Sequence, residues 1–341
     1  MLISGSKIIL ATDIVFKISL MFVFLALSLS SLQAQNLKTV TVAGWCKPIS
    51  EITNLLAEPD KKFFERRGLK FVYIPGTGGG SAIRNMLTGK ADIAFTDPAS
   101  FYQALDKGEK LIAIYNIYPQ NVFNVVSPKL RKIKKPGDLK GKTIGVYSLS
   151  SGTRQNLQVL LHQVGLTEAD VTIQVTGLLN FAPVIQGQVD ATAATDTGLF
   201  VGKLRGLKDF NVIQVKDYLN VPSDMFVVQK DTYENKKPLL RKFLKGYYDS
   251  AEWMIKNPEE AAKIAVRRAI NGRNQDINLE IIKLRNISAV SKTTRKKGLG
   301  AFDLDLLQKG ADTFKQLGLI TTQINISRVV KSDLIPKPDK R

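Results

Sequence analysis

Two stretches of the chain decide the fold, because they repeat one pattern about a hundred residues apart. The first is "LTGKADIAFTD", Leu87 to Asp97, and the second is "IQGQVDATAATD", Ile185 to Asp196. Each contains an apolar residue, a Gly, a polar residue, Ala or Val, Asp, a small or apolar run, and Thr-Asp. A helix, a tight glycine turn and a buried strand that ends at Thr-Asp would produce this order. The repetition therefore predicts two similar α/β lobes.

A second pair of related strings supports two lobes. "VFNVVSP" starts at Val122 and "MFVVQKD" starts at Met225. Each is predicted to be a strand that the chain enters after it crosses from one lobe to the other. One lobe then comprises residues 36–122 and 222–341, and the other comprises residues 123–221. Chance similarity between short apolar strings is the alternative.

The segments around these strings alternate between strand-like and helix-like patterns, which is typical of parallel sheets flanked by helices. The apolar spacing over Ile49 to Arg67 predicts one helix that ends at Gly68. Near the C-terminus, Asn257 is predicted to cap a helix whose first position is Pro258.

The N-terminal segment has the features of a secretory signal peptide. Lys7 and Lys17 precede the uncharged run "ISLMFVFLALSL", and "SSLQA" follows it with Leu32 and Ala34 at the small-residue spacing of a cleavage site. This apolar run is too short to span a bilayer. We expect cleavage after Ala34 and a location in the bacterial periplasm; an uncleaved anchor is the alternative.

Composition and charge limit the classes of partner and site that the chain can have. The chain has 341 residues and a net charge of +19, which becomes +18 without residues 1–34. The densest basic cluster, Lys129 to Lys142, contains no aromatic residue and no nucleic-acid-binding motif, so we expect a solvated segment and no nucleic-acid partner. A single Cys, Cys46, and a single His, His162, lie far apart in the sequence. We therefore expect neither a Cys-His pair nor a metal site.

Three segments resemble a known family. They are "FFERRGLKFVYIPGTGGGSAIRNMLTGKADIAFTDP", "DLKGKTIGVYSLSSGTRQNLQVLLHQVGL" with "FAPVIQGQVDATAATD", and "KKPLLRKFLKGYYDSAEWMIKNPEEA". Together they are similar to the periplasmic solute-binding proteins of ABC importers, in the branch that binds nitrate, sulfonates, taurine and thiamine-pyrimidine precursors. The similarity covers about residues 39 to 265.

The resemblance implies an α/β fold of two doubly wound lobes joined by two crossovers, the type II periplasmic binding fold, here with extra C-terminal helices. It implies a monomer without a cofactor that binds one small solute, sulfonate, taurine-like or pyrimidine-type. The partner would be an ABC importer permease in the inner membrane. A pyrimidine-precursor synthase-like enzyme of the same fold and a ligand-sensing receptor lobe are the alternatives.

Candidate binding residues lie at the predicted carboxyl ends of strands, where open α/β sheets bind ligands. They are Trp45, Cys46, Gly79, Gly80, Ser81, Thr96, Asp97, Ser150, Ser151, Gly152, Thr153, Phe181 and Asp196.

The turns "GTGGGS" and "SLSSGT" each open a helix, so their N–H groups and hydroxyls would suit an anion; simple capping is the alternative. Asp97 and Asp196 would instead bind an amine or cap a helix. Trp45 is predicted to be an aromatic wall, with core packing as the alternative. Phe181, Tyr147 and Cys46 are further wall candidates.

Overall fold

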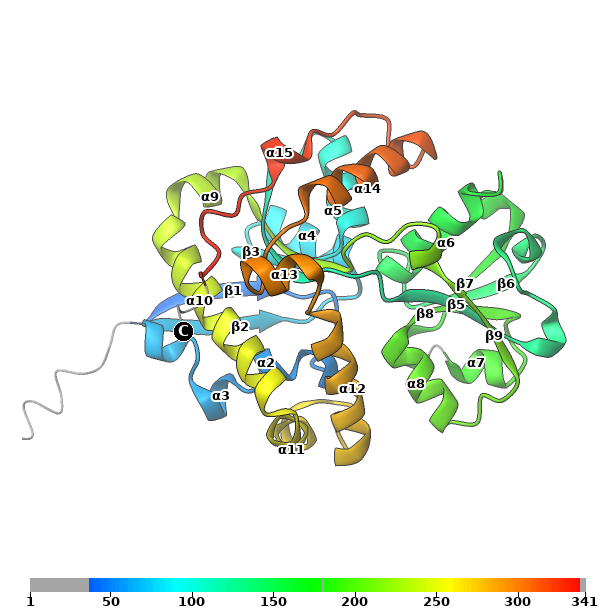
Figure 1. Ribbon diagram of the computed structural model, residues 1–341, viewed down its shortest axis with the longest axis horizontal. Helices are drawn as coiled ribbons and strands as arrows, with labels where there is room; N and C mark the ends of the chain where they lie inside the picture. The colour runs from blue at the N-terminus through cyan, green and yellow to red at the C-terminus, as the bar shows by residue number, and fades with distance from the viewer. Residues whose placement is uncertain (1–36, 180, 338–341) are drawn as a thin grey trace, which may run out of the picture. The chain divides into compact units, whose positions relative to one another are not determined.

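Two five-stranded sheets organise the part of the chain that the computed structural model describes, residues 37–179 and 181–337 (Figure 1). The first has the order β2-β1-β3-β10-β4 and the second has the order β7-β6-β8-β5-β9. The first sheet consists of β1 (Lys38–Ala43), β2 (Leu69–Ile74), β3 (Ile93–Thr96), β4 (Leu111–Tyr118) and β10 (Asp224–Gln229). The second consists of β5 (Phe123–Pro128), β6 (Thr143–Val146), β7 (Thr172–Val175), β8 (Ala191–Thr195) and β9 (Phe210–Gln214). The expected signal peptide lies outside the described residues.

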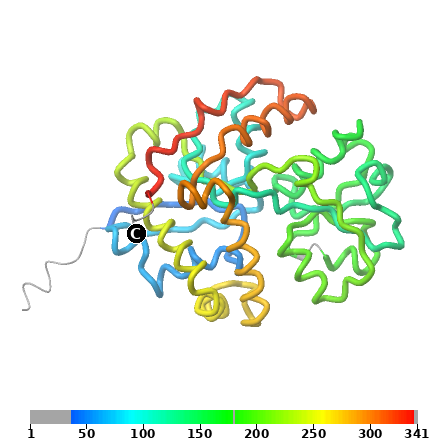
Figure 2. The backbone as a smooth tube through the Cα atoms, in the orientation of Figure 1, coloured from blue at the N-terminus to red at the C-terminus, as the bar shows by residue number. Residues whose placement is uncertain are grey.

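Helices connect and cover these strands, and we call each sheet with its helices the first or the second lobe. In the first lobe they are α2 (Thr53–Leu56), α3 (Glu58–Lys61), α4 (Gly79–Leu87), α5 (Pro98–Asp106), α9 (Lys230–Asn235), α10 (Lys237–Lys256), α11 (Pro258–Arg268), α12 (Gln275–Ser288), α13 (Lys292–Lys297), α14 (Leu304–Gln316) and α15 (Ile326–Val329). In the second they are α6 (Gly152–His162), α7 (Phe181–Ile185) and α8 (Asp196–Leu204). Figure 2 shows the C-terminal helices, yellow to red, returning to the blue and cyan strands of the first lobe.

The repeated sequence pattern occupies equivalent places in the two sheets. β3 and β8, which carry "IAFT" and "ATAAT", are both the third strand of their sheet. The predicted crossover strands exchange places: β5 follows β4 into the second sheet, and β10 follows β9 into the first. This confirms two doubly wound lobes joined by two crossovers. The exact lobe boundaries stay a prediction.

The parallel sheets expected from the alternating pattern are mixed sheets, because the crossover strands run in the opposite direction. β10 runs antiparallel to β3 and β4, and β5 runs antiparallel to β8 and β9. The other described pairs, β1 with β3 and β6 with β7 and β8, are parallel. A strand that enters from the opposite lobe is free to run in the other direction, because no crossover helix within its own lobe precedes it.

Each crossover strand is buried on both faces, which explains its continuous apolar sequence. In β10, Phe226 packs with α2 and α10, whereas Val227 packs with α4, α5 and α14 on the opposite face. In β5, Val125 faces α6 and Val126 faces α7 and α8. The two lobes therefore have helical layers on both sides of their sheets.

One local prediction is wrong and another is confirmed only in part. The single helix expected over Ile49 to Arg67 is divided into short α and 3₁₀ segments, because Lys62 has a left-handed φ of 57° and ends α3. Asn257 is the N-cap residue of α11 and Pro258 its first residue, as predicted, but the Asn257 side chain makes no capping bond: its Nδ2 donates to Trp253 O at 2.9 Å, at the end of the preceding helix. Within the described residues, no helix combines the length and the apolar character needed to cross a membrane.

Candidate functional site

A cavity of about 510 Å³ lies between the two lobes. Its wall includes the segments that follow β1, β3, β6 and β8, the start of β10, and one side of α12. Strand ends of both sheets therefore meet at one site, as the sequence predicts for an open α/β fold.

Seven of the thirteen predicted site residues line this cavity: Trp45, Gly79, Asp97, Ser151, Gly152, Thr153 and Phe181. Tyr147 also lines it. The other six lie behind or beside the wall: Cys46, Gly80, Ser81, Thr96, Ser150 and Asp196. A binding role for any of them stays a prediction.

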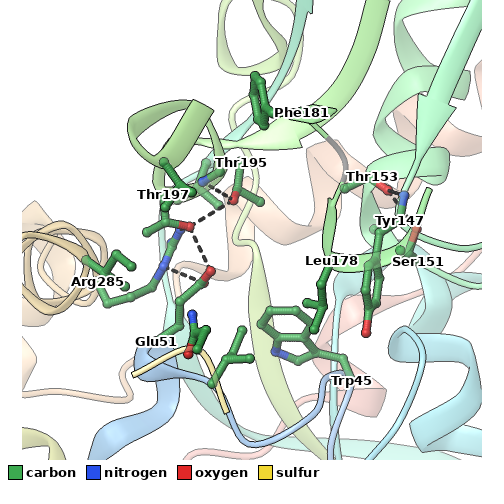
Figure 3. Close-up of a pocket in the computed structure, with 18 of the residues that line it drawn as sticks. Trp45, Glu51, Tyr147, Ser151, Thr153, Leu178, Phe181, Thr195, Thr197 and Arg285 are labelled. Carbon is green, nitrogen blue, oxygen red and sulfur yellow. Dashed lines mark hydrogen bonds and ion pairs between the residues drawn. The ribbon is translucent and has the colours of Figure 1, made fainter. Parts of the chain in front are cut away.

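Trp45 follows β1 and is one of the walls of the cavity (Figure 3). It is only partly buried, and its ring meets Phe95 edge to face, with centroids 6.3 Å apart and planes at 88°. The same indole therefore contacts the core of the first lobe on one side and the cavity on the other.

Three hydroxyls of the two glycine-rich turns, those of Ser81, Ser151 and Thr153, bond within their own turns. Ser81 Oγ donates to Gly78 O at 2.8 Å and Ser151 Oγ donates to Ser148 O at 2.7 Å. Thr153 Oγ1 accepts from Tyr147 N at 3.0 Å. Short hydroxyl side chains commonly bond the backbone groups nearest to them, and a role of these hydroxyls in anion binding stays a prediction.

The two turns also touch each other across the interlobe boundary. Gly80 N donates to Ser150 O at 3.2 Å, and Ser150 Oγ donates to Thr77 O at 3.0 Å. Gly78, with a φ of 126°, leaves no room for a Cβ, which would lie 2.2 Å from Ser150 O. The structure thus shows the lobes in direct contact beside the cavity.

Asp97 both caps a helix and lines the cavity. Its Oδ1 accepts from Ser100 N at 2.8 Å and its Oδ2 accepts from Ser100 Oγ at 2.9 Å, at the start of α5. Burial raises the pKa of Asp97 to about 6, although the bonds from Ser100 oppose the shift. The absence of a side chain at Gly79 makes room for this carboxylate, because a Cβ there would lie 1.9 Å from Asp97 Oδ2.

This raised pKa gives a pH-dependent contribution to stability. The stabilisation from a protonated Asp97 is complete below its unfolded-state pKa near 4 and is lost as the pH rises through about 6. Asn also caps helices well, so Asp97→Asn keeps the cap without the titration. As the pH rises from 5 to 7.5, we expect the free energy of unfolding of the wild type to fall by about 1 kcal/mol relative to that of Asp97→Asn, measured by urea denaturation. The same dependence of the free energy of unfolding on pH in the wild type and in Asp97→Asn would refute this prediction.

Asp196 has a different role from the predicted cap. Thr195 is the N-cap of α8, and its hydroxyl accepts from Gly198 N at 3.3 Å. The Asp196 carboxylate instead pairs with Nη2 of Arg285, a residue of α12 that is only 1% exposed. Arg285 therefore links the first lobe to the second.

Arg285 is the centre of a network on the cavity wall (Figure 3). Its Nε lies 2.9 Å from Glu51 Oε2, and its Nη2 donates to Thr197 Oγ1 at 2.9 Å. Thr197 Oγ1 in turn donates to Glu51 Oε1 at 2.8 Å. Burial lowers the pKa of Arg285, but Asp196 and Glu51 outweigh it and raise the pKa above its usual value. The guanidinium therefore stays charged.

Sequence reasoning missed Arg285, Glu51 and Thr197. Arg285 lies beyond the segments that carry the family resemblance, on a helix whose other face is exposed. Asp224, at the start of β10, was also missed, although it is buried and lines the cavity. Burial, together with the charge of Asp97, raises its pKa well above the usual value. The sequence signal that could have identified Asp224 as a site residue was its place at the start of a predicted crossover strand.

The sole Cys and the sole His lie outside the cavity wall. Cys46 is fully buried, with its Sγ 3.5 Å from Tyr73 Oη, and burial raises the pKa of its thiol well above the usual value. His162 Nδ1 lies 2.6 Å from Leu317 O. Over residues 37–179 and 181–337, no three His, Cys, Asp or Glu side chains gather in a way that would hold a metal ion.

This architecture, two doubly wound lobes with a cavity at their strand ends, is that of the type II periplasmic binding fold. The sequence profile of the NMT1/THI5-like family matches residues 49–261, and the chain belongs to this family. It is 22% identical over 309 residues to a riboflavin-binding protein, RibY, from Chloroflexus aurantiacus, covering 88% of this chain and 87% of that protein. It is 24% identical over 227 residues to a putative thiamine biosynthesis protein from Haemophilus influenzae, covering 66% and 71%.

Solved structures have the same fold. The alkanesulfonate-binding protein SsuA from Xanthomonas axonopodis pv. citri, bound to MOPS, superposes with a TM-score of 0.66 at 15% identity. The superposition covers 86% of this chain and 98% of that one.

Proposed function

We propose that the protein is the exported solute-binding component of an ABC importer. It captures one small organic solute in the cavity between its lobes and delivers it to the inner-membrane permease. The observation that carries the proposal is the cavity itself: about 510 Å³, between two lobes, with walls from the strand ends of both. Such a site is complete only when both lobes close on the ligand.

The relatives support this class of function. One is named for riboflavin binding and another for alkanesulfonate binding. A sulfonate, taurine-like or pyrimidine-type solute remains the proposed class. The protein is proposed to act as a monomer in the periplasm, after cleavage of the predicted signal peptide.

A binding role fits the site better than catalysis. Cys46 is buried behind the wall with a raised thiol pKa, which disfavours the reactive thiolate. His162 is engaged with Leu317 O, away from the cavity wall. We therefore propose that the protein releases its solute unchanged.

The proposal is tested by native mass spectrometry of the protein isolated from its own cells under non-denaturing conditions. We expect a bound solute of discrete mass that denaturation releases, at one molecule per chain. Importer-dependent uptake of that solute should require this protein. Conversion of the solute to a different compound on incubation with the protein would show an enzyme. Uptake that persists without the protein would contradict the importer role.

Trp45 gives a second test with the released solute. Trp253 is not part of the cavity wall and its Nε1 donates to Glu260 Oε2 at 3.0 Å, so Trp253→Phe leaves Trp45 as the single indole reporter. In that background we expect the fluorescence to change on binding. Trp45→Ala should weaken binding by about 1–3 kcal/mol, because the ring would pack against the solute.

The alternative is that Trp45 only packs the core. Trp45→Ala would then lower the melting temperature and leave the affinity of the folded molecules unchanged. Calorimetric titration and thermal unfolding of this one variant separate the two cases.

A further inference from the structure

Asp224 is a buried carboxyl group for which the described part of the chain provides no hydrogen bond and no ion pair. It is 7% exposed and lines the cavity at the start of β10. Within residues 37–179 and 181–337, its carboxylate makes no hydrogen bond and no ion pair. Burial of an uncompensated carboxylate is costly and raises its pKa, and a cation or N–H donor placed against the carboxyl group would favour the charged form again.

A second carboxylate lies opposite Asp224. β10 and β3 pair Phe226 with Phe95 and Met225 with Thr96. One further step along this register places Asp224 opposite Asp97. Residues directly opposite on neighbouring strands have Cβ atoms about 5 Å apart, and like charges there repel each other.

The buried cation nearby, Arg285, attracts Asp224 electrostatically, but its ion pairs are with two other carboxylates. The Nε of Arg285 pairs with the Glu51 carboxylate, and its Nη2 pairs with the Asp196 carboxylate. Two further arginines of the wall, Arg205 and Arg273, are exposed. The buried side of the cavity therefore holds more carboxylates than cations, in a chain whose net charge is +19.

The aromatic wall adjoins this acidic end. β1 pairs in parallel with β3, so Trp45, Asp97 and Asp224 follow or begin three neighbouring strands of one sheet. An indole beside carboxylates suits a planar ring that carries positive charge or N–H donors.

We propose that Asp224, together with Asp97, accepts hydrogen bonds from a nitrogen group of the solute, a protonated nitrogen or an amino group on a planar ring that packs on Trp45. The inference rests on the proposed function and specifies the ligand class of the same site. Asp224 is then the specificity-determining residue, because among the described residues its carboxyl group makes no hydrogen bond or ion pair that a solute would have to displace.

Two probes of matched size test this. Benzamidine carries a cationic amidinium on a planar ring, and benzoate carries a carboxylate on the same ring. Binding of each is measured by Trp45 fluorescence in the Trp253→Phe background and by ¹H–¹⁵N chemical shifts, at constant ionic strength. The variants are Asp224→Asn and, as the control, Asp217→Asn, which makes the same Asp-to-Asn change at an exposed position outside the cavity wall.

We expect the parent and Asp217→Asn to prefer benzamidine. Asp224→Asn should lose about tenfold or more in benzamidine affinity, since a hydrogen bond to a charged group is removed. Its melting temperature without ligand should equal or exceed that of the parent. If Asp224→Asn proves unstable, Asp97→Asn, which keeps the cap, should show the same loss of preference.

Three results would overturn the inference: a preference for benzoate in the parent, an unchanged preference in both Asn variants, or no benzamidine binding at the highest soluble concentration. Failure of the proposed function has a different signature. A co-purified solute without a nitrogen donor overturns the inference and leaves the importer role standing. If uptake of the solute does not require the protein but benzamidine is still preferred, the importer role is overturned and the inference stands.

Discussion

Arg285→Met is expected to lower the free energy of unfolding by about 3–5 kcal/mol, because it leaves Glu51 and Asp196 as unpaired carboxylates beside a cavity. Met fills a similar volume, so lost packing contributes little to the change. Urea denaturation of the ligand-free protein at neutral pH measures the effect. The cost comes from the carboxylates left behind and is not a measure of the ion pairs themselves.

Arg268→Met provides the matched control. Arg268 pairs with Asp60 at 3.1 Å, but its side chain is 41% exposed, and we expect a change below about 1 kcal/mol. A double variant, Arg285→Met with Glu51→Gln, should recover part of the loss, because the two residues share one network. Equal losses in Arg285→Met and Arg268→Met would show that the network is not buried as described.

Gly78→Ala is expected to weaken solute binding by about ten- to a hundredfold. Gly78 has a φ of 126°, and a Cβ there would lie 2.2 Å from Ser150 O and 2.8 Å from Ser151 Cα of the second lobe. The added methyl group therefore opposes the contact that the lobes make beside the cavity. Calorimetric titration with the solute recovered from the protein gives the affinity.

Gly80→Ala is the control for this prediction. It lies two residues further along and faces the same serine, but its Cβ would make an ordinary contact of 3.4 Å with Ser150 Cβ. We expect its affinity to stay within about threefold of the wild type, a difference below 1 kcal/mol. If both alanine variants bind equally well, the contact between the turns has no part in binding.

Local sequence patterns were sufficient to predict the α/β class and the two crossovers. The repeated string around Asp97 and Asp196 lies in equivalent strands, β3 and β8, because each lobe needs a small, apolar third strand followed by a turn. The crossover strands were predicted for a similar reason: burial on both faces demands a continuous apolar run. Their antiparallel direction could not be predicted, since strand direction depends on the path between the lobes.

The candidate site was predicted only in part. Trp45 and Gly79 both line the cavity. They could be predicted because strand ends and glycine turns are recognisable in a sequence. Arg285 and Asp224 could not be chosen from their neighbours, since their importance comes from partners distant along the chain. Arg285 meets Asp196, 89 residues away, and Asp224 lies opposite Asp97 through strand pairing. Such pairs exist only after the crossovers have brought both lobes together.

Small-angle X-ray scattering of the wild-type protein, with and without the solute recovered from it, tests the central claim most directly. Two lobes that close on a ligand between them must become more compact when it binds. We expect the radius of gyration to be smaller with saturating solute, and to return to the larger value when the solute is removed by denaturation and refolding. An identical radius of gyration in both states, with binding verified by calorimetry on the same samples, would contradict a cavity that works by closure of its lobes.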